Sequence, residues 1–360
     1  MMKYLLILII FINSNSFSQT QNTKSSFKTK KKIYLFGEAH FIKEKYDEIK
    51  AFTFEKIDDL NKGEKISFFF ELPYSINYAF KQMKDFGDTT VFYEWFNHLY
   101  QSKNKTPSYF WTDYRDFILE LIHYADNKGI ELELIGIDTE LEFRRTAFIL
   151  SQFENKIDTT IESLVNLDYI RNDSLTRSVL LNQIEELSKI SQNEIEFDIL
   201  KTLKNSLTID CTICLDRDQF MYSCFKQNFD STSCLNFVSL GLNHIVSKHD
   251  FSKASPLFRK KYKFDTIGYQ SFYELLDKEF KDQTLRVGIL ALNNKLKYFN
   301  MSKPSDYKTI MNSLERDYIE KQLLNKDVYR IKVSENKVLN NLSEQLDYLI
   351  IYRVSHYRWE

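Results

Sequence analysis

The chain has 360 residues, of which 43% are hydrophobic and 28% are charged, and its formal net charge is -1. This composition is typical of a globular protein with a large core and excludes a disordered chain. The near-neutral charge argues against nucleic acid or an acidic membrane as a partner.

The first 18 residues have the pattern of an export signal. Lys3 precedes an uninterrupted apolar run at 4–12, and Ser16-Phe17-Ser18 is a small-x-small cleavage pattern. The run is too short for a membrane span, which needs about 20 residues. We therefore expect 1–18 to be a signal peptide cleaved near Gln19, and 19–32 to be a flexible lead-in. The protein is expected to be exported, periplasmic or secreted, without a stable membrane anchor; an exposed N-terminal strand is the alternative.

Strand-like and helix-like patterns alternate along the first part of the mature chain. Apolar runs predict buried strands at 33–36, 66–70 and 132–137. Apolar residues at helical spacing predict helices at 44–60 and 112–128. A strand, a helical crossover and another strand form a parallel pair.

The region from 140 to about 210 has helical periodicity and no strand signal. Strand-like runs resume at 235–240, 285–292 and 347–352, separated by predicted helices at 269–280 and 305–324. The predicted fold class is therefore α/β, with a parallel-dominated central sheet flanked by helices. Residues 33–360 are expected to form a single catalytic-type domain, with a helical insertion at about 140–230 between the third and fourth strands.

Polar side chains follow the predicted strands. Gly37-Glu38-Ala39-His40 ends the first strand, and Gly241-Leu242-Asn243-His244 follows the fourth. Gly37 is expected to let the chain leave the strand sharply. Glu71 and Asp138 come after the second and third strands. Because the carboxyl ends of parallel strands meet at one sheet edge, we expect these side chains to gather there. Taken singly, each also has a structural interpretation, as a carboxylate near a helix N-terminus or a packed histidine.

At these positions the chain resembles the superfamily that contains erythromycin esterases, ChaN-like haem-associated lipoproteins and TraB/Tiki proteases. The shared features are the paired Gly-x-x-His motifs, Glu71 as the second glutamate, Gly136-Ile137-Asp138, and Arg217-Asp218-x-x-Met221. The esterases usually place two residues between the first Glu and His, whereas only Ala39 intervenes here. They also place His-Asn before the final histidine, and this chain lacks that pair. Both differences are closer to the ChaN-like and TraB patterns.

The predicted chemistry is hydrolysis of an ester, lactone or amide without a covalent intermediate. His40 is the expected general base, because a neutral imidazole titrates near pH 6.5. Glu38 and Glu71 are expected to orient it and the water. Arg217 is expected to bind a developing oxyanion or a substrate carboxylate, and His244 to donate to the same oxyanion or protonate the leaving group. Asp138 is expected to contact a small-molecule or peptide substrate. No Gly-x-Ser-x-Gly motif supplies a nucleophile.

Two alternatives use the same residues. Glu38, His40, Glu71 and His244 are also a plausible set of ligands for a divalent metal, as in a Tiki-like protease. A haem pocket of the ChaN type, with His40 or His244 as axial ligand, is the non-enzymatic alternative. We favour a site that works without a cofactor, with a divalent metal or haem as the alternatives. The sequence does not determine the substrate or the oligomeric state.

The four cysteines fall within a short segment outside the predicted site, at Cys211, Cys214, Cys224 and Cys234. In an oxidising compartment they allow two disulfides, in three connectivities. Cys211 and Cys214 have the spacing of a redox motif, but without a thioredoxin-like context. A structural or reduced pair is the preferred interpretation, with zinc as a weaker alternative.

Overall fold

A mixed β-sheet forms the centre of the computed structural model. The structure describes residues 32–39, 42–97, 108–140, 143–153, 173–209, 215–246, 270–294 and 310–355. These ranges belong to one compact unit. The predicted signal peptide and almost all of the lead-in lie outside the described residues, as do His40, Cys211 and Cys214.

Seven strands are present in the described residues: β1 Ile33–Glu38, β2 Lys65–Pro73, β3 Glu131–Asp138, β4 Leu235–Gly241, β5 Thr284–Asn294, β6 Val328–Lys332 and β7 Tyr348–Ser355. They pair in the order β3-β2-β4-β1-β5-β7-β6. Every neighbouring pair is parallel except β6 and β7, which are antiparallel. The predicted α/β class and the parallel-dominated sheet are confirmed, although β6 was not predicted.

The α-helices of the described residues are α2 Lys45–Ile57, α3 Ile76–Phe86, α4 Thr90–Asn97, α5 Ser108–Lys128, α6 Phe143–Leu150, α8 Ser174–Ile190, α9 Glu194–Thr208, α10 Leu215–Asn228, α11 Leu242–Ile245, α13 Phe272–Phe280, α15 Ser313–Leu323 and α16 Asn340–Ser343. Helices α6, α8, α9 and α10 lie between β3 and β4 in the chain. The predicted helical insertion between the third and fourth strands is therefore confirmed.

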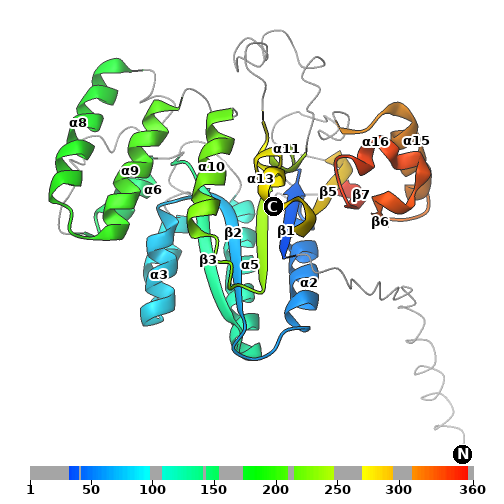
Figure 1. Cartoon of the computed structure of the whole chain (residues 1–360), viewed down its shortest axis with the longest axis horizontal. Helices are drawn as coiled ribbons and strands as arrows, with labels where there is room; N and C mark the ends of the chain where they lie inside the picture. Colours follow the sequence, from blue (N-terminus) through cyan, green and yellow to red (C-terminus); the bar gives the residue numbers. More distant parts are fainter. Residues whose placement is uncertain are drawn as a thin grey trace, which may run out of the picture. The chain divides into compact units, whose positions relative to one another are not determined.

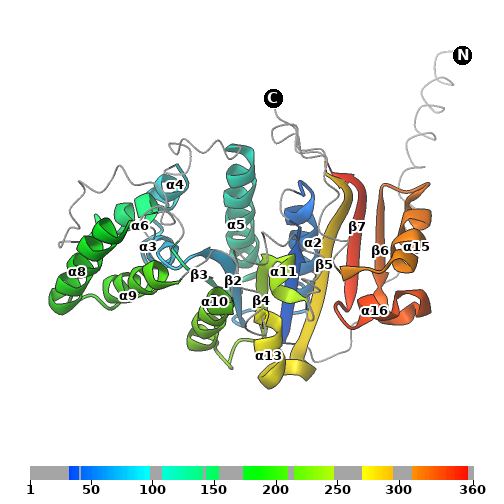
Figure 2. The same ribbon diagram turned by 90° about the horizontal axis from the view of Figure 1, so that it is seen from above.

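Alternation of side chains along the strands produces two different faces of the sheet. Helices α2 and α5 cover one face (Figure 1, Figure 2), and aromatic rings pack together there. Phe68 stacks on Phe70 with ring centroids 4.5 Å apart and on Phe237 at 5.7 Å, and Phe117 of α5 packs edge-on to Phe68. Aromatic side chains bury large apolar areas, so these ring contacts help to stabilise this layer.

The opposite face is mainly aliphatic and packs against α10, α11 and α13 (Figure 2). Gly37 lies within β1, which ends at Glu38, and its Cα faces this layer. A Cβ at Gly37 would lie 2.2 Å from Cδ1 of Ile245, and the residue does not have a positive φ. The expectation that Gly37 turns the chain out of the strand was therefore wrong. The glycine allows close packing of α11 on β1.

Strand β3 is an edge of the sheet, and an asparagine side chain hydrogen-bonds to it. The backbone N–H of Gly136 donates to Oδ1 of Asn77 at 2.6 Å, and Nδ2 of Asn77 donates to the Gly136 carbonyl at 3.0 Å. The amide of Asn77, on α3, thus makes the two hydrogen bonds that a neighbouring strand would make.

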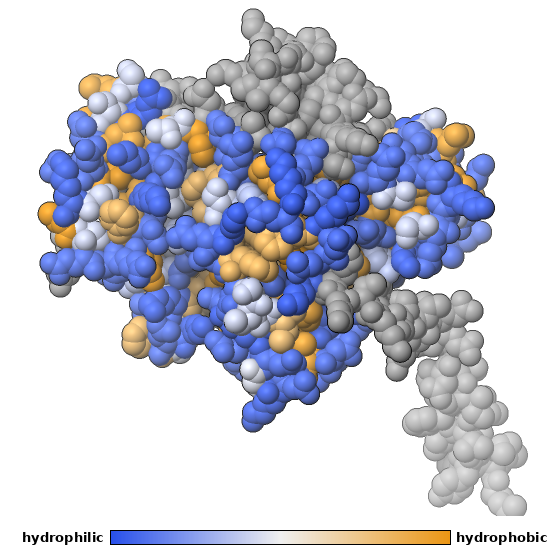
Figure 3. All heavy atoms as spheres, in the orientation of Figure 1, coloured by the Kyte–Doolittle hydropathy of each residue, from blue (hydrophilic) through white to orange (hydrophobic). Residues whose placement is uncertain are grey.

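Two of the four cysteines, Cys224 and Cys234, lie in the described residues. Cys224 and Cys234 are free thiols; Cys224 is buried, and Sγ of Cys234 donates to Oε1 of Glu64. No helix within the described residues is long and apolar enough to span a membrane. The face of the molecule shown in Figure 3 is mainly hydrophilic.

Candidate active site

The carboxyl ends of the four strands β1 to β4 bring a buried polar cluster together. Glu38 is the last residue of β1, Glu71 lies near the end of β2, and Asp138 ends β3. Gly241 ends β4 and leads directly into α11, which carries His244. This is the edge at which parallel α/β sheets bind ligands.

Arg217, on the first turn of α10, holds two of the predicted carboxylates. Its Nε lies 2.8 Å from Oδ1 of Asp138, and its Nη2 lies 2.6 Å from Oδ2 of Asp138 and 2.6 Å from Oε1 of Glu71. Bidentate pairing of this kind fixes both partners. Asp138 is only 1% exposed and Arg217 only 7%. Asp138, which is expected to contact substrate, is buried and paired with the guanidinium.

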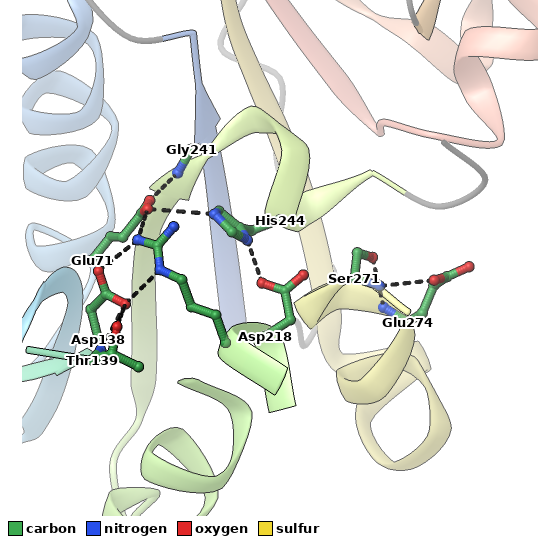
Figure 4. Close-up of polar contacts among 9 residues, drawn as sticks. Glu71, Asp138, Thr139, Asp218, Gly241, His244, Ser271 and Glu274 are labelled. Atoms are coloured by element: carbon green, nitrogen blue, oxygen red, sulfur yellow. Dashed lines mark hydrogen bonds and ion pairs between the residues drawn. The ribbon is translucent and has the colours of Figure 1, made fainter. Parts of the chain in front are cut away.

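His244 lies between two carboxylates. Its Nδ1 hydrogen-bonds to Oδ1 of Asp218, and its Nε2 lies 3.4 Å from Oε1 of Glu71 (Figure 4). Burial disfavours the charged imidazole, but Asp218 and Glu71 outweigh burial and raise the pKa of His244 to about 10. At neutral pH this histidine is therefore an imidazolium with two N–H donors, which is the protonation state of an acid rather than a base.

Glu71 connects the elements of the cluster. Besides accepting a hydrogen bond from Arg217, it accepts one at Oε2 from the backbone N–H of Gly241 at 2.5 Å (Figure 4). Contacts to α10, to the end of β4 and to His244 of α11 thus converge on one side chain. A change at Glu71 is expected to disturb all of these contacts.

Glu38 has a buried cationic partner. Nζ of Lys45, the first residue of α2, lies 2.7 Å from Oε1 of Glu38. Lys45 is 1% exposed and Glu38 is 8% exposed. Burial lowers the pKa of Lys45, while Glu38, Glu71 and Asp113 oppose that shift. The pair is therefore within electrostatic range of Glu71.

Glu140, two residues after the end of β3, anchors the helices around the site. Its carboxylate accepts hydrogen bonds from the backbone N–H and the hydroxyl of Ser75 at 2.7 and 2.9 Å, and from the hydroxyl of Thr146 at 2.5 Å. Its own backbone N–H donates to Oγ of Ser206. Complete burial raises the pKa of Glu140 to about 7, against the hydrogen bonds that lower it. The carboxyl group of Glu140 thus ties the end of β3 to the start of α3 and to α6, and its backbone N–H ties it to α9.

In the described part of the ligand set proposed for the metal and haem alternatives, the donor atoms of His244 and Glu71 are engaged in other contacts. Nδ1 of His244 hydrogen-bonds to Asp218, and its Nε2 lies 3.4 Å from Oε1 of Glu71. Both oxygens of Glu71 already accept hydrogen bonds. Within the described part of the chain, no group of three or more His, Cys, Asp and Glu side chains is arranged to hold a metal ion. His40, the other histidine of both alternatives, lies outside that part.

The structure thus joins four predicted residues by direct contacts, Glu71, Asp138, Arg217 and His244, and brings Glu38 within electrostatic range of the same cluster. Sequence reasoning missed Lys45, Asp218 and Glu140. Asp218 had a signal, since it forms part of the Arg-Asp pair of the motif. Lys45 and Glu140 had none, because their importance depends on burial.

Fold and site together define an α/β protein with a charged, buried cluster at the carboxyl edge of its sheet. Comparison by sequence adds nothing to this class: no family model matches the chain, and no curated protein matches it. Comparison of structures, in contrast, finds solved proteins with the same fold.

Three solved structures share the fold over most of their length. A mutant of erythromycin esterase EreC in its open conformation matches with a TM-score of 0.56 and 13% identity, covering 91% of both chains. A succinoglycan biosynthesis protein matches with a TM-score of 0.57 and 10% identity, covering 91% of this chain and 88% of the other. A Bacillus cereus protein matches with a TM-score of 0.52 and 11% identity, covering 91% and 89%.

The chain therefore has the fold of erythromycin esterase. The haem-binding ChaN of Campylobacter jejuni also matches, at 13% identity, but its TM-score of 0.34 is too low to support an argument. At these identities the likeness concerns the fold alone. The resemblance seen in the motifs is confirmed at that level.

Proposed function

We propose that this protein is an exported hydrolase that uses activated water to cleave an ester, lactone or amide. The observation that carries the proposal is the buried cluster of Glu71, Asp138, Arg217, Asp218 and His244 at the carboxyl edge of the sheet. Burying so many charges is costly, and perturbed ionisable groups gathered at a ligand-binding edge are typical of active sites. The esterase fold supports the same class of reaction.

In this proposal the acid and the base are different histidines. His40 follows Glu38 at the end of β1 and takes a proton from water, with Glu38 and Glu71 as the orienting carboxylates. His244, already protonated, supplies a proton to the leaving group. Its 3.4 Å contact with Glu71 is longer than a normal charge-assisted hydrogen bond of about 2.7–2.9 Å. The Nε2–H therefore retains the capacity to donate to a substrate oxygen.

Arg217 has a supporting role in this scheme. Its Nε and Nη2 are bound to Asp138 and Glu71, so it acts mainly by holding Glu71 in place. This differs from the direct contact with an oxyanion that the sequence favours. Asp218 orients His244 in the way that a third residue orients the histidine of a hydrolytic triad.

A hollow of about 340 Å³ lies between α9 and α10 of the helical insertion. It is lined by Tyr74 and by the facing sides of α9 and α10, including Asp198, Lys201 and Gln219. Helix α10 also carries Arg217 and Asp218, so one helix contributes different side chains to the hollow and to the cluster. The helical insertion is accordingly proposed to contribute to substrate choice.

The test is a screen of p-nitrophenyl esters, lactones and fluorogenic peptides with the purified mature protein. His40→Ala should reduce turnover by about 10²–10⁴-fold, the usual contribution of a general base, or about 3–5 kcal/mol of barrier. His123→Ala is the matched control, because His123 lies on the exposed side of α5 and bonds to Asn127. Turnover by His40→Ala at the wild-type rate would remove the proposed base.

Export is a separate proposal, supported by the N-terminal pattern of Lys3, a short apolar run and Ser-Phe-Ser. The protein expressed with its native N-terminus should be recovered outside the cytoplasm and begin at or near Gln19. N-terminal sequencing that returned Met1 would contradict it.

A further inference from the structure

Lys45 is a buried cation at the same edge of the sheet as the proposed active site. Its side chain is 1% exposed, and its Nζ lies 2.7 Å from Oε1 of Glu38. Lysine is almost never fully buried unless it is paired. The ammonium group of Lys45 is therefore held in the interior by the glutamate that ends β1.

The surroundings of Lys45 are acidic on several sides. Glu38 of β1, Glu71 of β2 and Asp113 of α5 all act electrostatically on the ammonium. The neighbouring Tyr114 of α5 lies in the field of Glu71, Glu38 and Asp138. Lys45 is thus a counter-ion to the carboxylates from the side of α2 and α5, as Arg217 is from the side of α10.

Stability alone gives no reason to keep this charge. A buried ion pair loses about as much free energy by desolvation as it gains by attraction, and apolar side chains of similar volume often replace such pairs without loss. A methionine has nearly the shape of lysine. What a methionine does not supply is a charged hydrogen-bond donor for the buried carboxylate of Glu38, which Nζ of Lys45 contacts at 2.7 Å.

We propose that Lys45 is a positioning residue of the active site. It fixes the Glu38 carboxylate at the end of β1 through a buried ion pair, and Glu38 in turn orients the water-activating group. This role rests on the proposed hydrolytic function and adds to it a residue that belongs to none of the sequence motifs. Lys45 acts through Glu38 and does not itself touch substrate.

A double-mutant cycle tests this dependence on Glu38. The proteins compared are wild type, Lys45→Met, Glu38→Gln, the double mutant and Lys45→Arg, assayed on the substrate whose turnover His40→Ala abolishes. Lys45→Met should lower kcat by about 10–100-fold and leave KM within about threefold, since the residue positions a catalytic group. In the Glu38→Gln protein the same substitution should change kcat by less than about twofold.

Two further variants separate charge from packing. Lys45→Arg keeps the positive charge and should recover most of kcat. Lys50→Met is the matched control on the same helix, because Lys50 is partly exposed and pairs with Asp47 and Glu120 at the surface; its kcat should equal that of wild type. If Lys45→Met does not fold, Lys45→Gln takes its place, because its amide still donates to Glu38 without a charge.

The outcomes distinguish the two proposals. If Lys45→Met lowers the melting temperature but the folded protein keeps its kcat, or if the losses from Lys45 and Glu38 are additive, Lys45 is only a structural residue and the inference is overturned. If the wild type hydrolyses none of the probes, or if His40→Ala is fully active, the proposed function fails and the role of Lys45 in it fails too.

Discussion

Strand β2 has at each of its ends a cation that holds two carboxylates, and the two arrangements differ in burial. At the start of the strand, Nζ of Lys65 lies 2.8 Å from Glu133 and 2.9 Å from Asp230, and the three side chains are 24%, 33% and 30% exposed. Near its end, Arg217 holds Glu71 and Asp138 at 2.6 Å, with exposures of 9%, 13% and 1%.

The difference in burial indicates which of the two ion-pair groups has a function other than stabilising the fold. At the solvated end, water screens the charges and either partner can be lost cheaply. At the buried end, each charge has lost its water and depends on its partners. Buried charges of this kind are typical of functional sites. The buried end is also the one that lies at the edge where parallel α/β sheets bind ligands.

The largest expected effect is at the buried end. Arg217→Met should lower the free energy of unfolding by about 3–5 kcal/mol, because it leaves Glu71 and Asp138 buried without their cation. Arg217→Lys should lose less, since it keeps the charge but not the bidentate geometry. Urea unfolding at pH 7 measures both. A loss below about 1 kcal/mol for Arg217→Met would make the two ends energetically alike and break the comparison.

A smaller effect should appear in the pH dependence of stability, through Glu140 near the same end of the sheet. Its pKa is raised from 4.5 to about 7 in the folded protein, so between these values the folded state binds more protons than the unfolded state. The free energy of unfolding should therefore fall as pH rises from 4.5 to 7, by up to about 3 kcal/mol from this group.

Glu140→Gln is the matching variant, because the glutamine cannot titrate. Urea unfolding between pH 4.5 and 7.5 should give a flatter profile for this variant than for wild type. Parallel profiles would show that Glu140 has an ordinary pKa and that burial at this end does not shift it.

The smallest effect is expected at the solvated end. Lys65→Met should lower the free energy of unfolding by no more than about 1 kcal/mol, because the ion pairs of Lys65 are partly exposed. Raising the salt concentration to about 1 M should reduce even that difference, since the Debye length falls to about 3 Å. The loss from Arg217→Met should change little with salt. A salt-independent loss at Lys65 would contradict the assignment of this end as solvated.

Much of the fold was predictable because it depends on local periodicity. The runs that became β1 to β5 are apolar and bounded by polar residues or glycine, and the insertion lacks any such run. Strand β6 was missed because its five residues are only partly buried or exposed and lie at an antiparallel edge. Gly37 was misinterpreted because its packing partner, Ile245, is distant in the chain.

The candidate site was predictable in part for the same reason. Strand direction alone brings Glu38, Glu71, Asp138 and His244 to one edge, since each follows a recognisable strand. It gives no information on which helix-borne side chains turn toward that edge. The contacts of Lys45 with Glu38 and of Asp218 with His244 depend on where α2 and α10 begin and how they pack, and the protonation of His244 depends on those contacts.

The amide of Asn77 bears on how this protein behaves at high concentration. An open strand edge is a template for pairing with another chain, which leads to aggregation and strand exchange. By occupying both hydrogen-bonding groups of Gly136 in β3, Asn77 removes one rung from that template. The neighbouring helix α3 packs on β3 as well. An intermolecular ladder starting at β3 would have to displace this side chain first, so Asn77 favours self-contained molecules over sheet-to-sheet association.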